Sequence, residues 1–290
     1  MQIDAIQRTL MFVVCITALA VSNAHAQKQT QEPVLRVVKR PDIAPAALPG
    51  PPHPLDPALK LAFNALGRMQ NNVHDYTATL VKRERIDGRL GREEHMFVKI
   101  RNRKPNGTPL SIYMNFTYPE DVAGREVIWV ENRNSNKLVA HDTGLLTGAI
   151  RVNLDPDGFM AMRGNKYPIY DAGLENLGVK LIEKAQRDRE VGMCEVRFVK
   201  SVVDGRNCTM IEVKHPEKKE PYDFHIAKVH IDNELRIPIR YAAYSWPRRP
   251  GGNPVLEEEY TYKNVKLNVK LSDEDFNPVS YTHLTLPTKA

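Results

Sequence analysis

The side chains of this sequence contain few arrangements that could catalyse a reaction. The phosphate-binding glycine loops, the nucleophile elbow G-x-S-x-G, the zinc motif H-E-x-x-H and the redox pair C-x-x-C are all absent. Residues 153–158, Asn-Leu-Asp-Pro-Asp-Gly, resemble the first half of a calcium loop. The glutamate that ends such a loop is replaced by Gly164, so we interpret the segment as a turn between strands.

The histidines do not form a metal-ligating pattern. His225 and His230 share one expected strand, where their odd separation points them to opposite faces. His95, His141 and His215 stand alone on strands and are expected at the surface. The sequence therefore predicts no metal, no cofactor and no catalytic residue.

Two cysteines, Cys194 and Cys208, lie in the folded part of the chain. In a regular hairpin turning at Asp204-Gly205, Cys194 lies roughly 30 Å from the paired end, whereas bridged Cα atoms are about 5–6 Å apart. Free thiols are favoured over a disulfide, which would require a badly broken first strand.

Charge and composition exclude several classes of protein. Lysine plus arginine exceeds aspartate plus glutamate by 41 − 35 = 6, and aromatic residues make up only 7% of the chain. This mild excess does not indicate a nucleic-acid partner. Basic residues crowd segment 82–104, but Glu84, Glu93 and Glu94 interleave with them, which favours a solvated face over a phosphate or lipid-headgroup site.

The start of the chain has the pattern of a signal peptide. An apolar run at residues 9–21 precedes Ala24-His25-Ala26 and is too short to span a bilayer, so we expect cleavage after Ala26. A buried N-terminal helix is the alternative. Val14 before Cys15 does not fit a lipoprotein signal, so the protein is expected to be periplasmic or secreted and not lipid-anchored. Residues 27–55, rich in proline, are expected to form an unstructured tether.

Residues 56–281 are expected to form one α+β domain, mainly antiparallel β. Apolar spacing predicts a helix from Asp56, as N-cap, and a second helix at about 171–189 with Asp171 as its cap. Alternating residues and turn signals predict a curved open sheet or half-barrel of about 8–11 strands. The expected strands are 76–86, 89–101, 110–117, 125–131, 136–141, 194–203, 208–215, 224–232, 237–246 and 255–264.

Two helices cannot cover the apolar face of so many strands, so the sheet either curls on itself or leaves a concave apolar surface open. We expect that surface to bind a lipid, an acyl chain or a lipidated protein, with transient contact to a membrane surface. A non-catalytic structural module of the cell envelope is the alternative, and a secreted hydrolase is a third. The side chains expected to line the surface are Ile112, Met114, Phe116, Trp129, Leu256 and Tyr260.

The order of short motifs resembles an exported bacterial family called domain of unknown function 1571, over roughly residues 60–280. The matching pieces include Glu84-Arg85, Leu154-Asp-Pro156 with Gly158, Tyr167-Pro168 with Gly173, Leu256-Glu-Glu-Glu-Tyr260 and Asp275-Phe-Asn-Pro278. The family has no assigned activity. The resemblance implies the lipoprotein-carrier fold of LolA and LolB, in which a curved antiparallel sheet shelters acyl chains. Residues 282–290 do not resemble the end of the family and are expected to be a non-native tail.

The signal-peptide interpretation predicts that the exported protein begins at Gln27. N-terminal sequencing of material from the host's periplasm or medium tests this directly. Cytosolic protein that retains Met1 would contradict the predicted export.

Overall fold

The computed structural model describes residues 50–142 and 151–278. The predicted signal peptide, the tail at 282–290 and most of the 27–55 tether lie outside the described residues. The helices are α2 (Asp56–Asn72), α3 (Phe159–Met162) and α4 (Leu174–Val191). Among these helices, none has the length and apolar character needed to cross a bilayer. The strands are β1 (Asp75–Ile86), β2 (Arg89–Leu90), β3 (Glu94–Arg101), β4 (Ser111–Tyr118), β5 (Glu126–Val130), β6 (Leu138–His141), β7 (Arg151–Leu154), β8 (Glu195–Val203), β9 (Arg206–Lys214), β10 (Ile226–Asp232), β11 (Pro238–Ser245) and β12 (Val255–Leu267).

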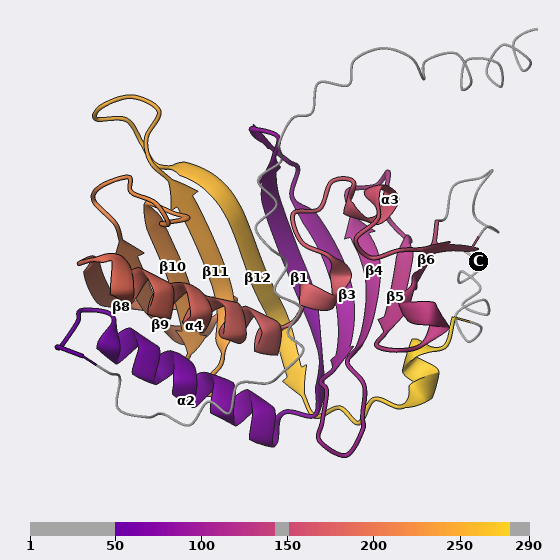
Figure 1. Cartoon of the computed structure of the whole chain (residues 1–290). Coiled ribbons are helices and arrows are strands. Elements are labelled where there is room, and N and C mark those ends of the chain that lie inside the picture. The colour runs from indigo at the N-terminus through magenta and orange to yellow at the C-terminus, as the bar shows by residue number, and fades with distance from the viewer. Residues whose placement is uncertain (1–49, 143–150, 279–290) are drawn as a thin grey trace, which may run out of the picture. The chain divides into compact units, whose positions relative to one another are not determined.

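All the described strands belong to one antiparallel sheet (Figure 1). The spatial order is β7-β6-β5-β4-β3-β1-β12-β11-β10-β9-β8, and β2 pairs only with β1 off this path. The predicted α+β class, with an open antiparallel sheet, an N-terminal helix and a mid-chain helix, is confirmed. Two strands of this order, β7 and β8, are its edges, and β8 exposes Phe198 and Val202.

Helices α2 and α4 pack against each other over the half of the sheet formed by β8 to β12 (Figure 1). Leu59, Leu66 and Met69 of α2 are almost fully buried in this layer. The two helices approach closely at Gly178, where a Cβ atom would lie 3.0 Å from Met69 Cε. The other half of the sheet receives its cover from segment 156–173, which contains α3.

The N-terminus of α4 differs from the prediction. The helix begins at Leu174 after Gly173, whose φ of 113° favours glycine. Asp171 does not cap it, because its carboxylate lies 2.6 Å from Lys180 Nζ. The buried Tyr76 hydroxyl instead accepts a hydrogen bond from the Leu174 amide at 2.8 Å, which satisfies one of the unpaired donors that begin every helix.

The start of α2 also differs. Asp56 is the first helical residue and not its N-cap, and its carboxylate accepts a hydrogen bond from the His53 amide. Residues 50–55 were expected to belong to the tether, but Leu55 is 1% exposed and His53 Nε2 lies 3.1 Å from the Gly192 carbonyl oxygen. The packed chain therefore begins before Asp56.

The strand β7 and the helix α3 were not predicted. The turn at residues 155–158 joins β7 to α3, so it is not a turn between two strands. The single strand expected at 89–101 is divided into β2 and β3, with residues 91–93 between them.

The face of β4 that carries Tyr113, opposite the face of Ile112 and Met114, is also partly buried. Tyr113 is 4% exposed because Phe276 packs with it, Ile128 and Val130 on that side of the sheet. The Arg101 guanidinium lies 5.1 Å from the Phe276 ring centre, and Lys99 Nζ lies 2.8 Å from Asp275. Phe276 of the Asp-Phe-Asn-Pro segment therefore completes a small second core on this face of the sheet.

The close approach of the helices predicts that Gly178→Leu lowers the free energy of unfolding by about 1–3 kcal/mol, because Met69 must give way in a packed layer. Gly67→Leu on α2 is the matched control, since nothing lies within 4 Å of its added Cβ. The control is expected to keep or raise stability through helix propensity, by up to about 1 kcal/mol. Urea denaturation measures both variants, and equal losses would contradict the close contact.

Candidate functional site

A large cavity lies between the sheet, the covering segment 156–173 and one side of α4. Its volume is about 550 Å³, within the range of about 300–1,000 Å³ typical of small-molecule sites. Most of its lining is apolar. The apolar side chains that form it include Leu80, Met96, Met114, Phe116, Val127, Leu138, Ala140, Leu154, Ile169, Leu177 and Leu181.

The period-two geometry of the strands positions this lining. Leu80 of β1, Met96 of β3 and Met114 of β4 all point to the face that carries the helices, because alternate side chains of a strand share a face. On the half formed by β8 to β12, this face is filled by α2 and α4. On the other half, the covering segment leaves the cavity.

The structure brings together three of the six residues expected to line an apolar surface. Met114, Phe116 and Tyr260 line the cavity. Ile112 is fully buried in the core, and Leu256 lies away from the cavity, with its carbonyl bound to Arg85 Nε. Trp129 is also buried, and its ring lies 5.9 Å from that of Tyr170 in the covering segment.

Two carboxylates of the cavity wall were missed. Glu84 of β1 and Glu258 of β12 are directly opposite in the strand register and are only 6% and 3% exposed. Like charges at such positions are destabilising unless they are compensated. Strand alternation could have placed Glu258 in the cavity wall, since it shares a face of β12 with Tyr260 and Tyr262.

Lysines compensate the pair. Lys166 Nζ lies 2.7 Å from Glu258 Oε2, and Lys82 Nζ lies 3.4 Å from Glu84 Oε2. Burial opposes the charge on Lys166, but Glu258, with smaller contributions from Glu257 and Glu84, outweighs it and raises the pKa of this ammonium above its ordinary value. The cavity wall therefore holds fixed charges of both signs.

Tyrosine hydroxyls donate further hydrogen bonds to both carboxylates. Tyr260 donates its hydroxyl to Glu84, and Tyr167 donates to Glu258 at 2.9 Å. Burial, together with the nearby carboxylates, raises the pKa of Tyr241 and Tyr260 well above the ordinary value, so these hydroxyls remain protonated at neutral pH. They act as hydrogen-bond donors to the carboxylates.

The carboxylates also fasten the covering segment to the sheet. The Lys166 amide donates to Glu84 Oε2 at 3.1 Å, and Lys82 Nζ donates to Asn165 Oδ1 at 2.6 Å. With the Lys166 and Tyr167 side chains, three consecutive residues of the segment are tied to β1 and β12. We call this group of contacts the carboxylate clasp.

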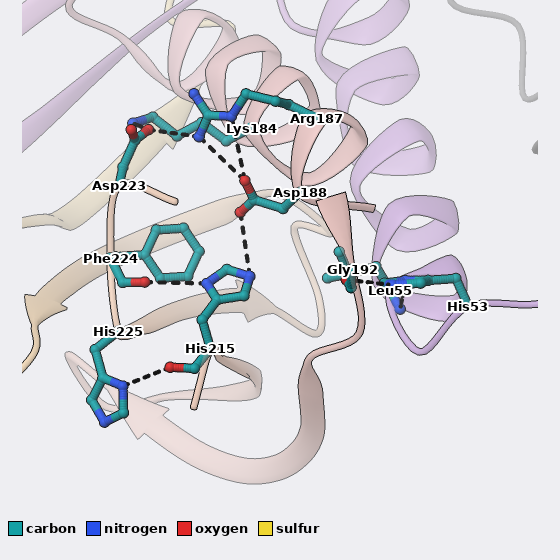
Figure 2. Close-up of polar contacts among 10 residues, drawn as sticks. All are labelled: His53, Leu55, Lys184, Arg187, Asp188, Gly192, His215, Asp223, Phe224 and His225. Atoms are coloured by element: carbon teal, nitrogen blue, oxygen red, sulfur yellow. Dashed lines mark hydrogen bonds and ion pairs between the residues drawn. The ribbon is translucent and has the colours of Figure 1, made fainter. Parts of the chain in front are cut away.

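A second buried polar cluster lies at the C-terminal end of α4 (Figure 2). His215, which was expected at the surface, is fully buried. Its Nδ1 donates to the Phe224 carbonyl at 3.1 Å, and its Nε2 faces Asp188 Oδ2 at 3.5 Å. The histidine sits here because Tyr222 stacks on its ring, with centres 3.9 Å apart.

The contact between Asp188 and His215 involves one proton. With Nδ1 donating to a carbonyl, a neutral His215 presents a lone pair to the carboxyl group, so one of the two must be protonated for them to attract. Desolvation raises the pKa of Asp188 to about 6, although Arg187 opposes the shift. Desolvation also lowers the pKa of His215. Arg187 and Lys184 link the cluster to Asp223 at 2.8 and 2.6 Å (Figure 2).

The remaining histidines and the cysteines agree only in part with the expectations. His95 and His141 are half-buried, and His141 lines the cavity. His225 immediately precedes β10, while His230 is buried within it beside Ser201. Cys194 and Cys208 are free and buried, as predicted, and burial raises the pKa of Cys194 to about 11. Within residues 50–142 and 151–278, no group of three or more His, Cys, Asp or Glu side chains has an arrangement that could hold a metal ion.

Comparison with known proteins gives a family. The model of a family described as protein of unknown function, DUF1571, matches residues 73–282. No curated protein sequence matches the chain.

Solved structures match at low identity. A putative outer membrane lipoprotein-sorting protein domain from Vibrio parahaemolyticus is 14% identical, with 76% of this chain and 95% of that chain covered and a TM-score of 0.36. A LolA superfamily protein from Nitrosomonas europaea is 9% identical, with 76% and 97% covered and a TM-score of 0.29. The MucA/MucB complex of Pseudomonas aeruginosa gives 13% identity, 76% and 60% coverage and a TM-score of 0.43. At these identities the likeness concerns the fold alone.

The Asp188 cluster predicts a pH dependence of stability. The pKa of Asp188 is about 6 when folded and near 3.8 when unfolded, so lowering the pH from about 7 to 5 protonates the folded state and adds stability. His215 acts oppositely, because its folded pKa lies below the unfolded value of 6.5 and the unfolded chain binds the proton first. Asp188→Asn removes the first contribution, so the variant should lose more stability on acidification than the wild type.

Urea denaturation between about pH 7 and pH 5 measures this difference. Asp121→Asn is the control, since Asp121 pairs with Arg92 at the exposed surface. Parallel pH profiles for the wild type and Asp188→Asn would show that Asp188 does not take up a proton in this range.

Proposed function

The chain belongs to the DUF1571 family of proteins of unknown function, and from that premise we propose that it is an exported binding protein. Its ligand is the acyl chain of a lipid or of a lipidated protein. The cavity between the sheet and the covering segment is the binding site. The observation that carries this proposal is the cavity's size of about 550 Å³ combined with its apolar walls.

The energetics of burial support an acyl ligand. Each buried methylene contributes about 0.8 kcal/mol, so a chain of about 14 carbons gains on the order of 10 kcal/mol before the costs of association. Such a ligand needs no dedicated polar group for affinity. Met114, Phe116, Leu138 and Leu154 offer side chains that can adapt to a flexible chain.

The carboxylate clasp supports binding over hydrolysis. Glu84 and Glu258 are held by lysine and tyrosine partners from the covering segment and from the sheet itself. A carboxylate in such contacts positions the covering segment and is not poised to activate water. The secreted-hydrolase hypothesis therefore ranks below the binding protein, and a structural module of the cell envelope remains the second candidate because β8 exposes apolar side chains at a sheet edge.

A residue that fills the cavity tests the proposal. Ala140 of β6 lines the cavity, and Ala140→Trp occupies space that an acyl chain would need. We expect the delipidated wild type to bind a fluorescent fatty acid and the variant to bind it at least tenfold more weakly. Val202→Trp on β8 is the control, because Val202 is 65% exposed and lies outside the cavity lining.

Native mass spectrometry of protein purified from its own host gives an independent readout. Wild-type protein should carry lipid that solvent extraction releases, and Ala140→Trp should carry less. Absence of bound lipid together with equal fatty-acid affinity in both variants would contradict the proposed site and favour the structural module.

A further inference from the structure

The helix α3 exposes large apolar side chains beside the cavity. Phe159 is 82% exposed and Met160 is 63% exposed. The two residues are adjacent in this helix of four residues. Val152 of the neighbouring edge strand β7 is 46% exposed. Large apolar side chains exposed together on a soluble protein mark an interaction surface. We call Val152, Phe159 and Met160 the apolar tip.

The apolar tip borders the opening of the cavity. Met160 and Val152 belong to the cavity lining and are nevertheless open to solvent. Ala161, the next residue of α3, also lines the cavity. The cavity and the tip therefore share side chains and form one continuous apolar surface.

Two arginines beside the tip make no ion pair among the described residues. Arg151 begins β7 and Arg163 follows α3, and both side chains are exposed. Among the described residues, neither arginine takes part in an ion pair or a side-chain hydrogen bond. Asp155 and Asp157 lie in the turn between β7 and α3 and keep their charges, since Asp157 accepts a hydrogen bond only from the neutral Tyr170 hydroxyl. The tip thus combines exposed apolar side chains with two arginines whose guanidinium groups are free to contact phosphate.

We propose that the apolar tip docks on an anionic phospholipid bilayer, with Phe159 and Met160 among the acyl chains and Arg151 and Arg163 against phosphate groups. This docking places the opening of the cavity at the bilayer, so a ligand can pass between them without exposing its methylenes to water. The role in transfer rests on the proposed function, whereas the docking itself does not.

The size of the tip favours a bilayer over a protein partner. A stable protein interface buries about 800 Å² on each partner, which a four-residue helix and one edge-strand residue cannot supply. Interfacial membrane binding needs only a few inserted apolar side chains and nearby cations. The composition of the tip matches that requirement.

Sedimentation with vesicles tests the docking. Delipidated protein is mixed with vesicles of phosphatidylcholine containing phosphatidylglycerol, and with vesicles of phosphatidylcholine alone. The wild type should bind the anionic vesicles more tightly. Phe159→Asp should weaken this binding at least tenfold, because one inserted aromatic side chain is replaced by a charge. Arg163→Gln should weaken it about fivefold, as expected for one cation near an anionic surface.

Val202→Asp is the matched control, since it places the same charge at an exposed apolar position on the opposite edge of the sheet. It should bind vesicles as the wild type does. Wild-type protein that ignores anionic vesicles, or binding that Phe159→Asp leaves unchanged, would overturn the proposal. An equal loss in the Val202→Asp control would also overturn it.

A fluorescent fatty acid in solution separates this proposal from the proposed function. Phe159 is not part of the cavity lining, so Phe159→Asp should keep the wild-type affinity for the fatty acid while losing vesicle binding. Ala140→Trp should show the opposite pattern. Vesicle binding through the tip without any fatty-acid uptake would uphold the docking and reject the acyl-binding cavity.

Discussion

The structure depends on a mismatch between the width of its sheet and the reach of its helices. An antiparallel sheet eleven strands across presents an apolar face that two helices of 17 and 18 residues cannot cover. The helices occupy the side of β8 to β12, where their close packing at Gly178 makes a dense layer. The opposite side must be covered by a segment without a long helix. The irregular segment packs less completely than two helices in contact with each other, and a cavity results.

An irregular cover needs polar anchors, because it lacks the continuous apolar stripe of a helix. The carboxylate clasp supplies them. Glu84 and Glu258 face each other on paired strands, and Lys166 adds its charge to that of Lys82 in compensating them only when the cover is in place. The sheet and its cover are therefore energetically interdependent. Breaking one partner of such a buried group is more costly than the net strength of the contact suggests.

Much of the fold could be predicted from local sequence, since period-two alternation and turn residues act over a few positions. The helix at Asp56 and the hairpin turning at Asp204-Gly205 are examples. Tertiary contacts decided the rest. The start of α4 is fixed by Gly173 and by the hydroxyl of Tyr76, which lies 98 residues before Leu174 in the sequence. No local signal at Asp171 could reveal this contact. The same distinction applies to the side chains of the candidate site. The positions of Met114 and Phe116 follow from strand alternation. The burial of His215 in the second cluster depends on contacts with Tyr222 and Asp188 from other elements.

The edge strand β8 has a consequence for how the protein behaves when it is concentrated. Its nine residues have no neighbouring strand on their outer side among the described residues, and Phe198, Val199 and Val202 are open to solvent. Such an edge can template the backbone of another chain. Arg197 and Lys200 interrupt the apolar sequence and act as charged gatekeepers against self-association. Because that protection is electrostatic, a higher ionic strength screens the two charges and weakens the protection against self-association through this edge.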